Sequence, residues 1–179
     1  MNVNSMREFL SPESIKLHTD YVKTLNAQHS ICERSMPEIR GKTPIDISTL
    51  NIKRSIKNEI LPRIISIKSH ETYFSSYTSI STPCPALKKY FSSESAFLFD
   101  VLTAAREMTS EFLFVFAERG RPMIRSSDEA RGVYLTHTPI LAVDLSEHAY
   151  FLDYNFDRDE YLKRAVAHLD LKKLSQYLK

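Results

Sequence analysis

The segment PILAVDLSEHAY, residues 139–150, carries a strand pattern that passes directly into a helical one. Its first half, up to Asp144, is a nearly continuous apolar run, which is typical of a central strand covered on both faces. The chain then returns to helical spacing, so that His148 follows the strand end by four residues. At a junction from strand to helix, a carboxylate and an imidazole at this spacing can point into one cavity. The stretch therefore predicts part of a functional site as well as a strand.

Two more strands are predicted in the C-terminal half. Phe112–Phe116 is an aromatic and branched run of strand type, and residues 118–122 hold the Gly and Pro of a turn. Met123–Arg125 can then pair back as a short strand. Helices are expected on either side, over residues 93–109 and from Glu147 to Leu178, where apolar side chains recur at helical spacing. This half is therefore predicted to be an α/β layer.

The N-terminal 80 residues are predicted to be helical. Ser11 can cap a helix that begins at Pro12, because its side-chain oxygen satisfies a free backbone N–H and proline suits the first helical position. The apolar stripe of this helix includes His18, which puts an imidazole on the buried face. A short second helix is expected within residues 44–56.

A second histidine is expected on a buried helix face. Pro62 opens a longer helical run whose apolar stripe includes His70. Residues 79–85 then combine Ser, Thr, Pro and Cys, and mark a boundary. The sequence therefore divides into an N-terminal α-hairpin domain, residues 1–82, and a C-terminal α/β domain, residues 83–179.

The composition excludes several classes of protein. The chain has 179 residues and a net charge of +2, from 24 Lys and Arg against 22 Asp and Glu, without the basic patch that nucleic-acid binding needs. No window approaches the roughly 20 apolar residues of a membrane span, and the N-terminus lacks the apolar core of a signal peptide. Cys32 and Cys84 form neither a metal-type spacing nor a disulfide framework. A cytoplasmic protein is expected, or one of an organelle matrix after removal of a targeting segment.

Three imidazoles and one carboxylate are thus expected on buried elements: His18, His70, His148 and Asp144. Buried charge needs a partner, and a divalent or trivalent metal ion would supply one. Nitrogen and oxygen donors without thiolate favour manganese or iron over a structural zinc site. Taken singly, the residues allow another interpretation, because a histidine on an apolar helix face is more often a hydrogen-bonded core residue. Asp144 could also cap the following helix, beside a surface pair of Glu147 and His148.

The same region resembles the signature of the iron/manganese superoxide dismutase family. The family pattern is Asp-x-Trp-Glu-His-Ala-Tyr followed by Asp-Tyr, and residues 144–154 are similar to it, with Arg158 and Tyr161 where the family's next Arg and Tyr are usual. Three upstream segments are similar to the family's helix one and to the helix that brings its second histidine ligand: Ser11–His18, Tyr21–Asn26 and Ile67–Phe74. The resemblance covers about residues 8–178.

The resemblance implies a fold, a cofactor and a reaction. The fold is α+β, with an N-terminal helical hairpin layer packed on a C-terminal α/β layer that holds a three-stranded antiparallel sheet. The cofactor is one Fe or Mn ion per subunit, with His18, His70, Asp144 and His148 as ligands. The reaction is the disproportionation of superoxide to dioxygen and hydrogen peroxide.

Two further roles come with the resemblance. Glu147 would be the family's dimer-bridging carboxylate, which reaches across a twofold interface to His148 of the partner subunit, so a homodimer is expected. Tyr21 would be the family's gateway tyrosine. The expected partners are therefore superoxide and a second copy of the chain, with no nucleic acid and no membrane.

The sequence departs from the family around the ligands. Ser146 stands where the signature has Trp, and Ser66 stands where iron-type members have a Gln one turn before the second histidine. His137 is a candidate to replace the Gln that manganese-type members take from the sheet. His18 and Tyr21 are three residues apart instead of two helical turns. Either a few residues are missing between them, or His18 matches a non-ligand histidine and the first ligand is lost; we prefer the former, because the residues before His18 align without a gap.

These departures leave a second function open, namely a catalytically inactive dismutase-like structural subunit, for example of an organellar ribosome. The four retained ligands and Glu147 favour the enzyme over the scaffold. Hydrolysis at a zinc centre made of the same residues ranks last, because it needs a general base that the sequence does not identify.

Overall fold

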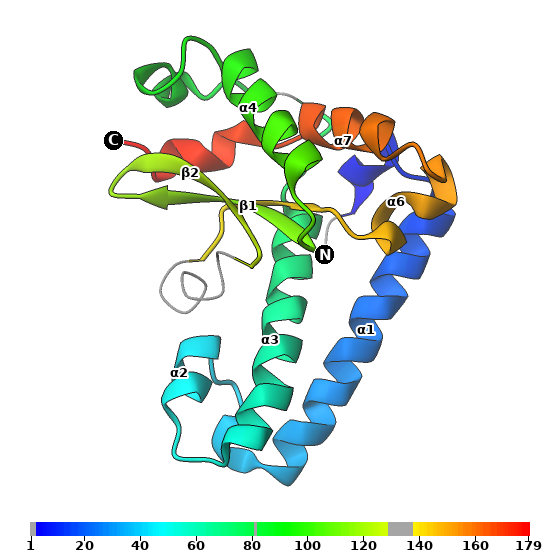
Figure 1. The fold of residues 1–179 in the computed structure, drawn as a ribbon, viewed down its shortest axis with the longest axis vertical. Helices are drawn as coiled ribbons and strands as arrows, with labels where there is room; N and C mark the ends of the chain where they lie inside the picture. The colour runs from blue at the N-terminus through cyan, green and yellow to red at the C-terminus, as the bar shows by residue number, and fades with distance from the viewer. Residues whose placement is uncertain (1–2, 81, 129–137) are drawn as a thin grey trace.

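The computed structural model describes residues 3–80, 82–128 and 138–179. Two long helices project as a hairpin from a layer that holds the sheet and the helices of the C-terminal half (Figure 1). The sheet has three strands among the described residues, and all its pairings are antiparallel. The predicted α+β fold, a helical hairpin packed on an α/β layer, is therefore confirmed.

Helix α1, Pro12–Ser35, begins where the sequence predicts. The Ser11 hydroxyl accepts a hydrogen bond from the Ser14 amide, and a proline and a glutamate occupy the first turn. These groups satisfy a free backbone donor and complement the positive end of the helix dipole. The helix then continues through His18 and Tyr21 as one element.

Helix α2, Pro44–Thr49, is short, and helix α3, Arg54–Ser75, forms the second arm of the hairpin. The prediction that this arm opens at Pro62 is wrong, because α3 begins earlier and Pro62 lies inside it. An internal proline removes a backbone hydrogen bond and crowds the preceding turn. Ile60 and Ile64, on either side of the proline, are buried, so tertiary packing outweighs the local cost.

Strand β1, Phe112–Glu118, lies at the centre of the sheet, between β2, Arg121–Ser126, and β3, Leu141–Asp144. The prediction that the last of these is the central strand is wrong, because β3 lies at an edge of the sheet that the described residues form. All four of its residues are nevertheless buried, since the end of α3 packs against it. The Ala142 amide donates to the Ser76 hydroxyl at 2.7 Å, which satisfies a donor that another strand would otherwise pair.

The remaining helices cover the sheet and close the layer. They are α4, Glu94–Glu107, α6, Glu147–Tyr154, and α7, Arg158–Ala167, with 3₁₀ turns at Asn4–Glu8, Pro37–Ile39, Pro85–Lys89 and Leu171–Gln176. The Arg158 guanidinium donates to the carbonyls of Ala105 and Met108, each at 3.0 Å. It therefore caps the C-terminal end of α4 and ties it to the start of α7.

Two apolar cores hold the described parts of the chain together. The larger surrounds the sheet and the adjoining ends of α1 and α3, and the smaller ties the far end of the hairpin through Ile39, Ile47, Ile60 and Ile64. The predicted division after residue 82 stays a prediction. None of the helices described here is long and apolar enough to cross a membrane.

Candidate metal centre

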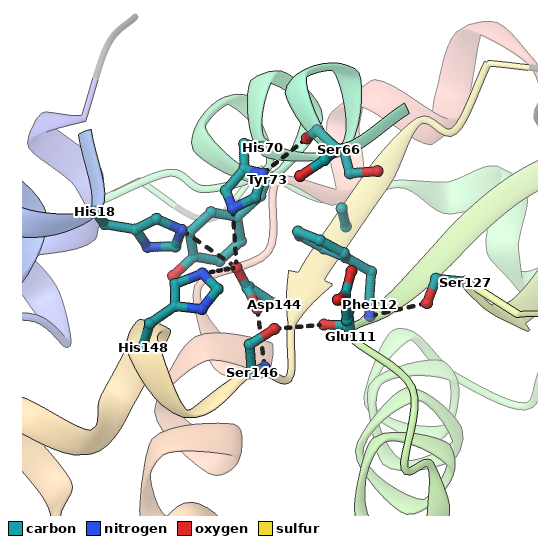
Figure 2. A network of polar contacts seen from close by, with 12 residues as sticks. His18, Ser66, His70, Tyr73, Glu111, Phe112, Ser127, Asp144, Ser146 and His148 are labelled. Atoms are coloured by element: carbon teal, nitrogen blue, oxygen red, sulfur yellow. Dashed lines mark hydrogen bonds and ion pairs between the residues drawn. The ribbon is translucent and has the colours of Figure 1, made fainter. Parts of the chain in front are cut away.

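Four side chains from four elements meet between the hairpin and the sheet (Figure 2): His18 on α1, His70 on α3, Asp144 at the end of β3 and His148 in the first turn of α6. One donor atom of each lies within 4.8 Å of the donor atoms of the other three. The structure therefore brings together all four residues that the sequence predicts as ligands.

The Asp144 carboxylate lies at the centre of this cluster. Its Oδ2 is 3.2 Å from Nε2 of His18, 3.4 Å from Nε2 of His148 and 3.6 Å from Nε2 of His70. The His18 ring stands edge-on to the other two imidazoles, with centroid separations of 5.1 Å and 4.9 Å. Three imidazole nitrogens and one carboxylate oxygen thus converge on a common point.

Three of these donor atoms are buried without a hydrogen-bond partner in the described structure: His18 Nε2, His70 Nε2 and Asp144 Oδ2. A buried polar atom that lacks a hydrogen-bond partner lowers the stability of the fold by about 1–3 kcal/mol. Native structures therefore seldom contain several such atoms at one place. A metal ion at this point would satisfy all three at once. The donor set fits iron or manganese, for which imidazole and carboxylate are suitable ligands.

The electrostatics of the cluster favour the metal-binding protonation state at two of its residues, His70 and Asp144. Burial lowers the pKa of His70 to about 4 and outweighs the attraction of the Asp144 carboxylate. Burial acts to raise the pKa of Asp144, but its contacts with His148 and His18 outweigh burial and hold that pKa well below its usual range. At neutral pH His70 is therefore neutral and Asp144 is ionised, as metal coordination requires.

Backbone groups orient two of the ligands. His70 Nδ1 lies 2.7 Å from the carbonyl oxygen of Ser66. Because a carbonyl only accepts, Nδ1 carries the proton and the Nε2 lone pair is free for a metal. Asp144 Oδ1 accepts a hydrogen bond from the Ser146 amide at 2.9 Å, which leaves Oδ2 facing the histidines.

Two buried tyrosines support Asp144 from the core side. The Tyr161 hydroxyl donates to the backbone carbonyl of Asp144 at 2.8 Å, and the Tyr73 hydroxyl lies 3.3 Å from that of Tyr161. The Tyr73 ring also packs against His18, with centroids 5.1 Å apart. Tyr73 is not predicted as a site residue from the sequence, although its position three residues after His70 puts both on one face of α3. That spacing is the signal that could have identified it.

The centre opens to solvent on the side of His148 and Tyr21. The side chain of His148 is 40% exposed, whereas those of His18 and His70 are almost fully buried. The Tyr21 ring lies across the two neighbouring imidazoles, 5.4 Å from His70 and 5.1 Å from His148 between centroids. Glu147 lies beside His148 and is exposed, so the structure does not turn its carboxylate toward the cluster of its own chain.

Glu111 is a neighbour of the cluster that the sequence analysis does not predict. Its carbonyl accepts hydrogen bonds from the Leu145 amide at 2.8 Å and from the Ser146 hydroxyl at 3.5 Å. Burial opposes the imidazolium of His148, but the carboxylates of Asp144 and Glu111 favour it and the pKa of His148 is raised. Glu111 comes to the site only through the pairing of β1 with β3, which no local pattern shows.

A cavity of about 650 Å³ adjoins the centre between α3 and the start of β1. Ser66 and Phe112 line it, and both contact His70, through the Ser66 carbonyl and through rings whose centroids are 5.1 Å apart. His137, the predicted substitute for a glutamine, lies outside the described residues.

The chain is similar in sequence to known metal-binding proteins. The family model for iron/manganese superoxide dismutases, C-terminal domain, matches residues 84–177, which is more than half of the chain. The chain belongs to the iron/manganese superoxide dismutase family. A curated relative, the iron superoxide dismutase of Campylobacter coli, is 23% identical over an alignment 192 residues long. The alignment covers 94% of this chain and 82% of the relative.

This superoxide dismutase family member draws the four residues of its candidate metal centre from both layers. The matched C-terminal domain supplies Asp144 and His148, and the preceding helices supply His18 and His70. The two departures closest to the ligands, Ser146 and Ser66, contact them through backbone groups. Because a backbone contact does not depend on side-chain identity, these substitutions leave the ligand positions intact.

Proposed function

We propose that the protein is a superoxide dismutase that holds one iron or manganese ion per subunit with His18, His70, Asp144 and His148. The observation that carries the proposal is the convergence of four donor atoms within 4.8 Å, three of them buried and without hydrogen-bond partners in the described chain. A scaffold subunit has no need of such a cluster, whose desolvation is unfavourable unless a metal ion compensates it.

When bound, iron or manganese supplies a one-electron couple with which one superoxide is oxidised to dioxygen and a second, with two protons, is reduced to hydrogen peroxide. The ionised Asp144 contributes the negative charge that favours the higher oxidation state, and the imidazole nitrogens of His18 and His70 moderate this preference. Burial of these side chains excludes bulk water from the ligands. The protein's part is thus to set the redox balance and to control access.

Tyr21 is proposed as the residue at the entrance. Its ring lies against His70 and His148 and the residue is 44% exposed, so one face meets the ligands and the other meets solvent. A phenolic hydroxyl at this border can donate a hydrogen bond to an incoming anion or to a water molecule. This position supports a gateway role, although Tyr21 is only three residues from His18.

A homodimer is proposed through the face that α1 and α6 share. Glu147 is exposed beside the half-exposed His148, so a partner's Glu147 could accept a hydrogen bond from that imidazole. Leu17 and Phe151 are 58% and 44% exposed on the same two helices, which supports burial of this face against a second copy. We expect Glu147→Ala to shift the mass measured by light scattering toward the monomer, with Glu59→Ala, at an exposed position on α3, as the control.

The direct test of the proposed activity uses purified protein reconstituted separately with Fe(II) and Mn(II). Metal content and superoxide dismutation are measured on the same fraction, for the wild type, for His148→Ala and for the control His168→Ala, whose histidine lies outside the cluster. We expect activity in one metal form of the wild type and of the control, and none in His148→Ala. A metal-loaded wild type without activity would refute the enzyme and favour the structural subunit.

A further inference from the structure

Two further buried polar atoms, both on α1, have no hydrogen-bond partner among the described residues. The described structure gives none to Nδ1 of His18 or to the hydroxyl oxygen of Ser14. Both residues are buried, with 2% and 4% of their surface exposed. They are four residues apart in one helix, so both side chains lie on the same face, one turn apart.

We propose that the Ser14 hydroxyl accepts a hydrogen bond from the Nδ1–H of His18 when Nε2 of His18 binds the metal. The inference rests on the proposed metal centre and assigns a positioning role to a residue outside the predicted ligand set. Ser14 touches neither substrate nor metal in this account, and it acts only through the orientation and basicity of the His18 ring.

The chemistry of a metal-bound imidazole requires such an acceptor. A neutral histidine that binds a metal through Nε2 carries its proton on Nδ1, and that N–H is almost always held by an oxygen acceptor. His70 meets this requirement with the Ser66 carbonyl at 2.7 Å. His148 is 40% exposed, so solvent or a partner can serve it. His18 is the buried ligand for which the described chain offers no assigned acceptor.

The position of Ser14 makes it the natural acceptor. A helical side chain leans toward the N-terminal turn, so the His18 ring extends over the turn that holds Ser14. The capping bond of this turn uses the Ser14 amide, which donates to the Ser11 hydroxyl at 3.1 Å, and leaves the Ser14 hydroxyl uncommitted. A hydroxyl has two lone pairs to accept with, and a rotation about one side-chain bond redirects it.

Ser14→Ala is expected to affect the metal-free protein and the metal-loaded protein differently. The described structure gives the Ser14 hydroxyl no hydrogen-bond partner, so Ser14→Ala is expected to remove no stabilising hydrogen bond from the metal-free protein. In the loaded protein the same change removes the acceptor of a ligand's N–H. Loss of such a partner typically weakens metal affinity by about 10- to 100-fold. A merely structural serine would instead alter the stability of both forms.

The experiment measures the Fe(II) and Mn(II) dissociation constants by competition with a chelator, together with the thermal unfolding of the metal-free protein. The variants are Ser14→Ala, which lacks the acceptor, and Ser14→Thr, which keeps a hydroxyl. Ser69→Ala is the matched control, because Ser69 is equally buried and adjoins His70 but its hydroxyl donates to the Ile65 carbonyl at 2.8 Å.

We expect Ser14→Ala to raise the dissociation constant about 10-fold or more without lowering the unfolding temperature of the metal-free protein. Ser14→Thr should restore most of the affinity, and Ser69→Ala should bind like the wild type. Wild-type affinity in Ser14→Ala would overturn the role of Ser14 while leaving the metal centre intact. A wild type that binds neither metal would overturn the proposed function itself, and the role of Ser14 with it.

Discussion

His18 Nε2 lies 3.2 Å from Asp144 Oδ2, and this approach joins the first long helix to the last residue of the sheet. The same oxygen also faces His70 and His148, so that α1, α3, β3 and α6 all meet at one carboxylate. Three donor atoms at this junction are buried and have no hydrogen-bond partner among the described residues. A metal ion bound by these residues would therefore be energetically coupled to the packing of the two layers.

The coupling predicts that metal stabilises the fold. A ligand that binds only the folded state adds about 4 kcal/mol when its free concentration is 1,000 times its dissociation constant. We expect the unfolding temperature to fall when Fe or Mn is removed by a chelator and to recover when the metal is returned. Calorimetry of the loaded, stripped and reloaded protein measures this, and equal unfolding temperatures in all three would count against a metal between the layers.

Tyr161→Phe tests the support beneath Asp144. The change removes the hydroxyl that donates to the Asp144 carbonyl and accepts from Tyr73, and leaves two buried groups without a partner. The expected loss in the free energy of unfolding is about 1–3 kcal/mol. Denaturant unfolding measures it. Tyr177→Phe, at a position 53% exposed, is the control and should unfold like the wild type.

Tyr21→Phe separates the ring of Tyr21 from its hydroxyl. The ring packs against His70 and His148, and the phenylalanine keeps that packing. We therefore expect full metal content together with a lower dismutation rate and an altered pH profile, because only the hydroxyl at the entrance is lost. Tyr21→Ala should in addition expose the two imidazoles. Unchanged kinetics in Tyr21→Phe would remove Tyr21 from the entrance role.

The metal-free protein should lose stability as the pH falls from about 6.5 to about 4. The pKa of His70 is lowered to about 4 by burial, whereas an unfolded chain titrates near 6.5. Within that window the unfolded chain binds the proton and the folded chain does not, so acidification favours unfolding by roughly 3 kcal/mol in total. His148 has a raised pKa and contributes the opposite sign, because the stability it adds below its ordinary pKa is lost as the pH rises.

Urea unfolding at several pH values, with a chelator present, measures this dependence. His70→Gln removes the titrating group and should flatten the profile between pH 4 and pH 6.5. A wild-type profile that is already flat there would show that His70 is accessible to protons in the folded state.

Local chemistry was enough to predict much of the fold. Ser11 and Pro12 fix the start of α1 because capping and proline geometry act within one turn. The helical spacing of His18 and His70 with apolar neighbours predicts their burial, and the run that ends at Asp144 predicts a buried strand. The strand, both helices and the polar residues of the cluster were therefore all accessible from sequence patterns.

The failures concern contacts between distant segments. Pro62 predicts a helix start by local rules, but the burial of Ile60 and Ile64 carries α3 through it. A continuous apolar run indicates burial without saying whether a strand or the end of α3 covers the β3 edge. Glu111 likewise reaches the site only by strand pairing. The order of strands in the sheet and the contacts between distant segments are properties of the assembled fold. The periodicity of a single sequence therefore does not specify them.

The proposed four-residue metal site is tested by the metal content of the wild type and of Asp144→Asn after the same Fe or Mn reconstitution. Asparagine keeps the oxygen that accepts from the Ser146 amide, so the local backbone has reason to stay in place, while the charge that faces three imidazoles is lost. We predict about one ion per chain in the wild type and less than about a tenth of that in the variant. An empty wild type, or equal metal in both proteins, would contradict the account.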